Sequence, residues 1–111
     1  MRFTDIDFEK GQGLVPVVIQ DYKTGDVLML GYMNDEALQK TLDTGLVYFW
    51  SRTRKKLWLK GEESGNKLHV KEIFKDCDND TILIKIALIG KNVCHTGRKS
   101  CFFQQIKKED L

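Results

Sequence analysis

The sequence has little that would mark a secreted, membrane-bound or disulfide-stabilised protein. It contains one proline, three cysteines and no apolar run near the roughly 20 residues that a membrane helix needs. Residues 1–7 show no apolar segment of signal-peptide type. An odd number of cysteines cannot all pair within one chain. We therefore expect a cytoplasmic protein whose reduced thiols serve metal binding or catalysis.

The chain also lacks a large excess of positive or negative charge, which limits the partners that it can have. The formal net charge is +2, too small to predict general binding to nucleic acid. Hydrophobic residues make up 41% of the chain and charged residues 31%, as in ordinary soluble proteins. A chain of 111 residues fits one domain with a modest core, so we expect a single domain over residues 1–111.

Alternating apolar residues and turn signals predict an α+β fold, mostly antiparallel β-sheet with one main helix. The helix should begin after Asn34, a suitable N-cap followed by acidic residues, and end at Gly45. A loop is expected over residues 90–100. Strands are expected over residues 15–22, 27–33, 46–51, 57–60, 67–75, 81–89 and 101–106.

Carboxylate and thiol alternate in the segment Asp76–Asp80. On an extended backbone its three aspartates would face one way and Cys77 the other. Carboxylates suit magnesium and thiolates suit zinc, so one segment could serve two metals. An acidic turn is the plainer alternative. A calcium loop is disfavoured, because Thr81 and Ala87 stand where its glycine and glutamate would be.

The other two cysteines, Cys94 and Cys101, flank a loop with a spacing wider than the usual zinc knuckle. Spacing alone is therefore a weak zinc signal, and free cysteine is often just a small buried residue. Three thiolates without an obvious fourth ligand fit an open, catalytic site. His95 could be a fourth ligand, a proton carrier or a plain loop histidine. His69, on an expected strand, is better explained as a structural histidine.

A basic run, Arg52–Lys60, is interleaved with tryptophan and leucine. Basic side chains beside aromatic rings can hold phosphate and stack a base. A solvated hairpin loop is the usual explanation for such a run.

Taken together, these segments resemble the phosphoribosyl-AMP cyclohydrolase family of histidine biosynthesis. The resemblance extends roughly from Gly13 to Phe103, with the motifs in the family's order. Departures are few: Gly31, Glu63, Asn79 and Val93 replace the family's usual alanine, threonine, glycine and alanine. The motifs are Leu28–Leu38, Thr44–Gly45, Tyr48–Arg54, Leu57–Trp58, Lys60–Asn66, Asp76–Asp80 and Cys94–Phe103.

The resemblance implies hydrolytic opening of the adenine ring of phosphoribosyl-AMP between N1 and C6, with His95 as proton shuttle. It implies a compact, intertwined homodimer of the monofunctional form, without a fused pyrophosphohydrolase domain. Zinc would be shared between subunits by Cys77 of one chain and Cys94 and Cys101 of the other. Magnesium would be held by Asp76, Asp78 and Asp80. The residues expected to bind the phosphates and riboses are Arg52, Arg54, Lys60, Glu62, Ser64 and Gly65.

Two other classes of function remain as alternatives. A structural zinc-binding interaction module would have a closed four-ligand site and no turnover. A small nucleic-acid binder would need a broad basic face, against which the low net charge argues. We therefore expect no nucleic-acid and no membrane partner, and a small-molecule substrate.

Overall fold

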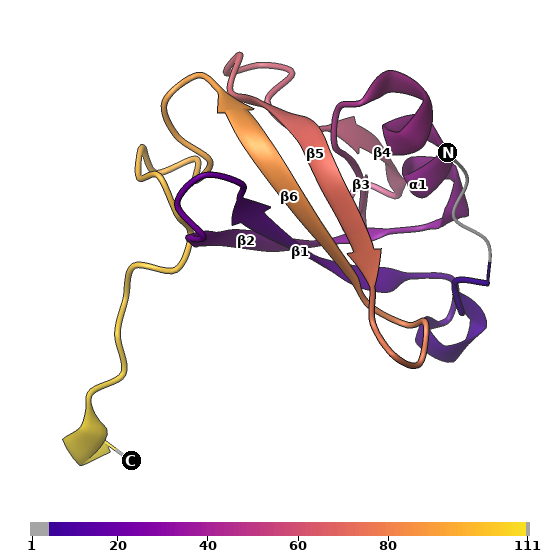
Figure 1. Ribbon diagram of the computed structural model, residues 1–111, viewed down its shortest axis with the longest axis horizontal. Coiled ribbons are helices and arrows are strands. Elements are labelled where there is room, and N and C mark those ends of the chain that lie inside the picture. The colour runs from indigo at the N-terminus through magenta and orange to yellow at the C-terminus, as the bar shows by residue number, and fades with distance from the viewer. Residues whose placement is uncertain (1–4, 111) are drawn as a thin grey trace.

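The computed structural model describes residues 5–110 and places six strands and one α-helix within that range (Figure 1). Residues 1–4, which begin the segment inspected for a signal peptide, and residue 111 lie outside the described range. Within residues 5–110 no helix is both long and apolar enough to cross a membrane. The elements are η1 (Glu9–Gly11), β1 (Val15–Asp21), β2 (Val27–Met33), α1 (Asp35–Thr44), β3 (Tyr48–Ser51), β4 (Lys56–Leu59), β5 (Lys67–Lys75), β6 (Ile82–Ile89) and η2 (Lys108–Asp110).

The main sheet has the strand order β2-β1-β6-β5. Its outer pairs, β1 with β2 and β5 with β6, are antiparallel, whereas β1 and β6 run parallel in the centre. The parallel register sets Val17 opposite Ile82, which joins two hairpins distant in sequence. The expected α+β fold with mostly antiparallel pairing is confirmed, and the parallel central pair is an addition to it.

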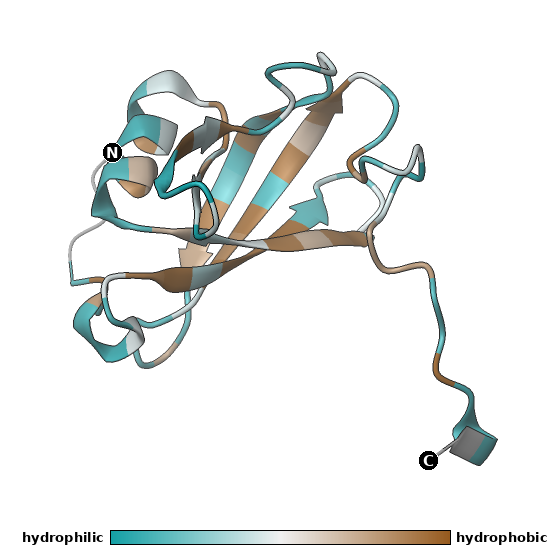
Figure 2. Ribbon diagram, turned by 180° about the vertical axis from the view of Figure 1, so that it is seen from behind, coloured by the Kyte–Doolittle hydropathy of each residue, from teal (hydrophilic) through white to brown (hydrophobic). Residues whose placement is uncertain are grey.

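The core lies on the inward face of the two central strands. Val15, Val17 and Ile19 of β1 are buried, as are Ile84 and Ile86 of β6, and the residues between them are only partly covered. This is the period of two expected when one face of a sheet packs against other elements. Figure 2, coloured by hydropathy, shows these strands as mostly brown, with teal or paler segments interrupting β5 and β6.

A second layer, α1 with the β3–β4 hairpin, packs against the β2 side of the main sheet. Asn34 caps α1 as expected, accepting a hydrogen bond of 2.8 Å from the backbone N–H of Ala37. Gly45 ends the helix in the left-handed conformation. The buried Thr41 hydroxyl donates to the carbonyl of Ala37 at 2.8 Å and accepts from the N–H of Tyr48 at 3.0 Å. The helix is thereby fastened to β3.

The prediction of a strand over residues 101–106 is wrong. After Cys101, whose N–H donates to the carbonyl of Leu28 at 2.7 Å, the chain forms no ladder and extends away from the body (Figure 1). Phe102 and Ile106 are 63% and 72% exposed. A strand needs a neighbouring strand to satisfy its backbone groups, and this segment meets none among the described residues.

Candidate functional site

Most of the expected substrate-binding residues surround one cavity of about 510 Å³. Its walls come from the turn after β3, from β4 and the loop that follows it, and from the loop after β6. Thiol, imidazole, ammonium, guanidinium and carboxylate groups therefore share one space. The lining residues are Ser51, Thr53, Arg54, Trp58, Lys60, Gly61, Glu62, Glu63, Ser64, Asn66, Asn92, Val93, Cys94, His95 and Gly97.

Cys94 lines this cavity, and its thiol interacts with that of Cys101, so we call these two residues the thiol pair. The pKa of the Cys94 thiol lies below its usual range, chiefly because its sulfur hydrogen-bonds the Thr96 hydroxyl at 3.1 Å. Partial withdrawal from water raises the pKa of Cys101, and its interaction with the Cys94 thiol acts in the same direction. These shifts favour ionisation of Cys94 before Cys101, which leaves a Cys94 thiolate next to a protonated Cys101 thiol.

Lys60 supplies positive charge to the thiol pair. Its ammonium lies 5.3 Å from the centre of the Trp58 ring, and its side chain lines the cavity together with Cys94. Burial lowers the pKa of Lys60, whereas the negative charges of Cys101 and Cys94 act to raise it. A cation placed here stabilises thiolates and could equally attract a phosphate.

The loop that carries the two thiols is fixed to the β1–β2 turn by charge. The ammonium of Lys99 lies 3.0 Å from Asp21 and 3.1 Å from Asp26. Its ion pair with Asp21 is the main cause that lowers the pKa of that carboxyl. The Ser100 hydroxyl adds a hydrogen bond of 2.8 Å to the carbonyl of Val27. We call the three charged residues the Lys99 clasp.

Two glycines allow other parts of the loops that form the cavity to approach Asn66 closely. An added Cβ at Gly61 would collide with the Asn66 backbone, and one at Gly90 would collide with the Asn66 side chain. Both glycines have positive φ, of 85° and 117°. The Oδ1 atom of Asn66 also accepts a hydrogen bond of 3.2 Å from the N–H of Lys91. The loops after β4 and β6 therefore meet at Asn66.

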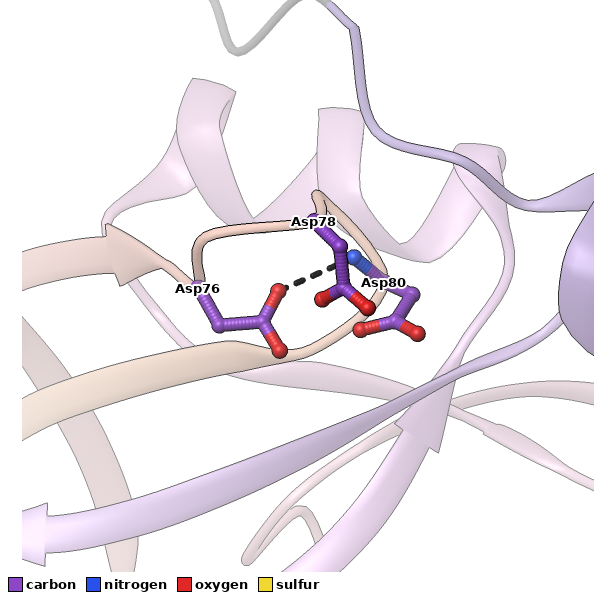
Figure 3. Close-up of side chains that lie close together, drawn as sticks. All are labelled: Asp76, Asp78 and Asp80. Carbon is purple, nitrogen blue, oxygen red and sulfur yellow. Dashed lines mark hydrogen bonds between the residues drawn. The ribbon is translucent and has the colours of Figure 1, made fainter.

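A second group of functional side chains is the carboxylate triplet, defined as Asp76, Asp78 and Asp80 in the β5–β6 loop (Figure 3). One oxygen from each lies within 4.8 Å of the others. The expected extended backbone is wrong here, because residues 77–80 form a turn and bend. Asn79 has φ of 65°, a conformation that asparagine tolerates. The turn, rather than strand alternation, gathers the carboxylates.

Hydrogen bonds and a lysine hold the triplet in place. Oδ1 of Asp76 accepts from the backbone N–H of Asp80 at 3.0 Å and of Thr81 at 3.2 Å. The Lys10 ammonium lies 3.3 Å from Asp78 and 3.0 Å from Asp80. This lysine lowers the pKa of Asp80 to about 2, while the neighbouring Asp80 carboxylate raises the pKa of Asp78.

The remaining expected site residues lie elsewhere. Cys77 is exposed in the turn of the triplet. Within residues 5–110 the triplet is the only group of three metal-ligating side chains, so one chain does not bring its three thiols together. Arg52 stacks on Tyr32, with its guanidinium carbon 4.0 Å from the ring centre, and does not line the cavity. Gly65 lies in a turn outside the lining, and His69 is exposed on β5.

Sequence reasoning missed several residues of these sites. Asn92 and Thr53 line the cavity but carry no local signal in the sequence. Lys10 contacts carboxylates that lie 68 and 70 residues further along the chain, so its role becomes visible only once the strands are paired. Gly61 and Gly90 could have been noticed, since a glycine often marks a close approach of backbone segments.

Fold and site together define a small α+β protein in which a thiol, an imidazole and basic groups line one cavity, while an acidic loop lies at the opposite end of the β5–β6 hairpin. The family model for phosphoribosyl-AMP cyclohydrolase matches residues 29–103, and this range includes the thiol pair, the lining and the carboxylate triplet. The chain belongs to the phosphoribosyl-AMP cyclohydrolase family.

Relatives named phosphoribosyl-AMP cyclohydrolase match over nearly the whole chain. The protein of Solibacter usitatus is 58% identical over 92% of this chain and 81% of its own length. That of Listeria monocytogenes serotype 4b is 57% identical over 96% of this chain and 98% of its own. That of Clostridium botulinum is 56% identical over 89% of each.

Proposed function

We propose that this chain is a hydrolase that opens the adenine ring of phosphoribosyl-AMP between N1 and C6 in histidine biosynthesis. The observation that carries the proposal is the cavity, where Cys94, His95, Arg54 and Lys60 line one space in a chain of this family. Its volume of about 510 Å³ lies in the range of small-molecule sites.

The reaction needs water to attack C6 and the C6–N1 bond to break, which leaves a carboxamide and a formimino group. One proton must leave the water and another must reach N1. His95 lines the cavity directly after Cys94, so it is placed to move such a proton. Arg54, Lys60 and Ser64 line the same space and supply donors for the two phosphates.

A zinc ion fits the thiol pair by the chemistry of its donors. The thiols of Cys94 and Cys101 lie close enough to influence each other's pKa, and the pKa of Cys94 is lowered, which favours a ligating thiolate. We propose Cys77 of a partner subunit as the third ligand, because Cys77 is exposed and does not join the pair within its own chain. Zinc would supply Lewis acidity that makes water acidic near neutral pH.

Magnesium is proposed for the carboxylate triplet. Its oxygens are the hard ligands that magnesium prefers, and the Lys10 ammonium already occupies a cation's place between two of them. Asp76 keeps one oxygen for backbone hydrogen bonds and has the other available for a metal. The ion would offset the negative charge of the triplet.

The shared zinc site requires a homodimer, which we propose to be intertwined and cytoplasmic. The exposed apolar side chains of Phe102 and Ile106 on the extended C-terminal segment are the kind of surface that a second copy would cover. A purely structural zinc module is less well supported, because the thiol pair lies at an open cavity rather than in a closed four-ligand cage.

The test is a spectroscopic turnover assay with phosphoribosyl-AMP, zinc and magnesium. His95→Gln should lower kcat about 10²- to 10⁴-fold while zinc content stays unchanged. His69→Gln is the matched control, since His69 lies on β5 outside the cavity, and should retain kcat. Absence of turnover by the metal-loaded wild type would reject the proposed function. Full activity of His95→Gln would contradict only the proposed role of His95 in proton transfer.

A further inference from the structure

We propose that Lys10 is a built-in counter-ion of the carboxylate triplet and that a divalent cation binds there by displacing it. The inference rests on the magnesium site of the proposed function and adds a residue that sets its affinity. With Lys10 in place, the site should bind a cation less tightly than three unpaired carboxylates would. Displacement of the ammonium should also favour incoming ions of high charge.

The contacts of Lys10 are direct and come from a distant part of the chain. Its Nζ atom lies 3.3 Å from Oδ2 of Asp78 and 3.0 Å from Oδ2 of Asp80, and both contacts are ion pairs with hydrogen bonds. The side chains are 48%, 56% and 26% exposed, so water and ions can reach the cluster.

The backbone near Lys10 is docked onto the acidic loop, which places the ammonium reproducibly. The N–H of Lys10 donates to Oδ1 of Asp7 at 3.1 Å. The N–H of Asp7 in turn donates to the carbonyl of Asn79, inside the loop, at 2.7 Å. The N–H of Gly13 closes the segment by donating to the carbonyl of Phe8 at 2.7 Å. A movement of the ammonium therefore does not require the segment itself to detach.

The same oxygen atoms cannot serve both cations well. Oδ1 of Asp76 is engaged by two backbone N–H groups, and Lys10 contacts Oδ2 of both Asp78 and Asp80. A metal held by all three carboxylates would therefore take up Oδ2 atoms that Lys10 now contacts or lie directly beside its ammonium. Magnesium binds oxygen at roughly 2.0–2.1 Å, which would leave the ammonium a few ångströms from a dication. Repulsion at that separation favours release of Lys10 into solvent.

The first test is calorimetric titration of magnesium chloride into zinc-loaded, magnesium-free protein. Lys10→Met should bind magnesium roughly two- to thirtyfold more tightly than wild type, because the metal no longer competes with two exposed ion pairs. Lys10→Arg should stay near wild type. Lys23→Met is the charge-matched control, since Lys23 lies in the exposed turn at the other end of β1, and its affinity should change little.

The outcomes separate the inference from the site on which it rests. Equal or weaker magnesium binding by Lys10→Met would overturn the displacement and leave the magnesium site standing. No magnesium binding by any variant would overturn both the site and the inference, while the turnover assay would still judge the enzymatic function.

A second measurement uses the wild-type protein and so does not depend on a variant that folds. Acylation of lysine amines followed by mass spectrometry should label Lys10 faster when magnesium is present, with Lys23 as an internal reference. Unchanged or slower labelling of Lys10 at saturating magnesium would contradict displacement.

Discussion

At the scale of single residues, Gly31 shows how closely the core is filled. A Cβ at this position would lie 2.6 Å from Cε1 of Phe49, whose side chain is only 1% exposed. We predict that Gly31→Ala lowers the free energy of unfolding by about 1–3 kcal/mol, because the buried ring has little room to move. Urea denaturation measures this change.

The control for this prediction is Gly11→Ala. A Cβ at Gly11 would meet nothing within 4 Å, so this variant should stay near wild type. If Gly31→Ala were as stable as Gly11→Ala, the packing of Phe49 against β2 would be looser than the distances indicate.

Residues with strong local preferences could be predicted from sequence, and residues that act across the fold could not. Asn34 and Gly45 delimit α1 as expected, because capping depends on neighbours three or four residues away. The left-handed Asn79 was likewise foreseeable. Lys10 was not, since its partners are separated from it by most of the chain.

At the scale of elements, the Lys99 clasp should decide how firmly the thiol loop is held. Asp21→Asn removes the ion pair at 3.0 Å, and we predict that zinc affinity falls by up to about tenfold, measured by competition with a chelator. Asp26→Asn is the matched control, because Asp26 is 56% exposed against 13% for Asp21, and should have the smaller effect. Equal effects would mean that the clasp does not depend on the buried partner.

The clasp also predicts a pH dependence whose sign follows from the lowered pKa of Asp21. Because the pKa is lower in the folded protein than the ordinary 3.8, the ion pair stabilises the fold above that value. Its contribution should disappear as the pH falls below about 4 and Asp21 becomes protonated. In Asp21→Asn this part of the acid destabilisation should be missing from the unfolding curve.

The strands show that their positions can be predicted from the sequence but that their pairing cannot. Strand-like residues bounded by turn signals located β1, β2, β5 and β6 to within a residue, and alternation supported β6 in particular. It could not reveal that β1 and β6 pair in parallel, because strand partners are chosen by the whole fold. The segment 101–106 has strand-like residues, but it finds no partner strand within the described chain.

At the scale of the whole molecule, some of the candidate groups come together within one chain and one residue does not join them. The cavity, the thiol pair and the carboxylate triplet form within a single chain, whereas Cys77 remains exposed and separate from the pair. The sequence motifs led to the proposed ligand residues through a family resemblance. Spacing alone could not tell whether one chain or two would supply the thiols of the proposed zinc site, because spacing carries no information about a subunit interface.

The shared thiol site is the central claim, and complementation between inactive chains tests it most directly. Cys77→Ser and Cys94→Ser homodimers should each lack turnover and tight zinc. After mixing, with heterodimers verified by two different tags, one of the two sites in each heterodimer receives neither defect. About half of the sites in the heterodimer should therefore bind zinc and turn over substrate. Verified heterodimers that remain inactive and zinc-free would contradict a site shared between subunits.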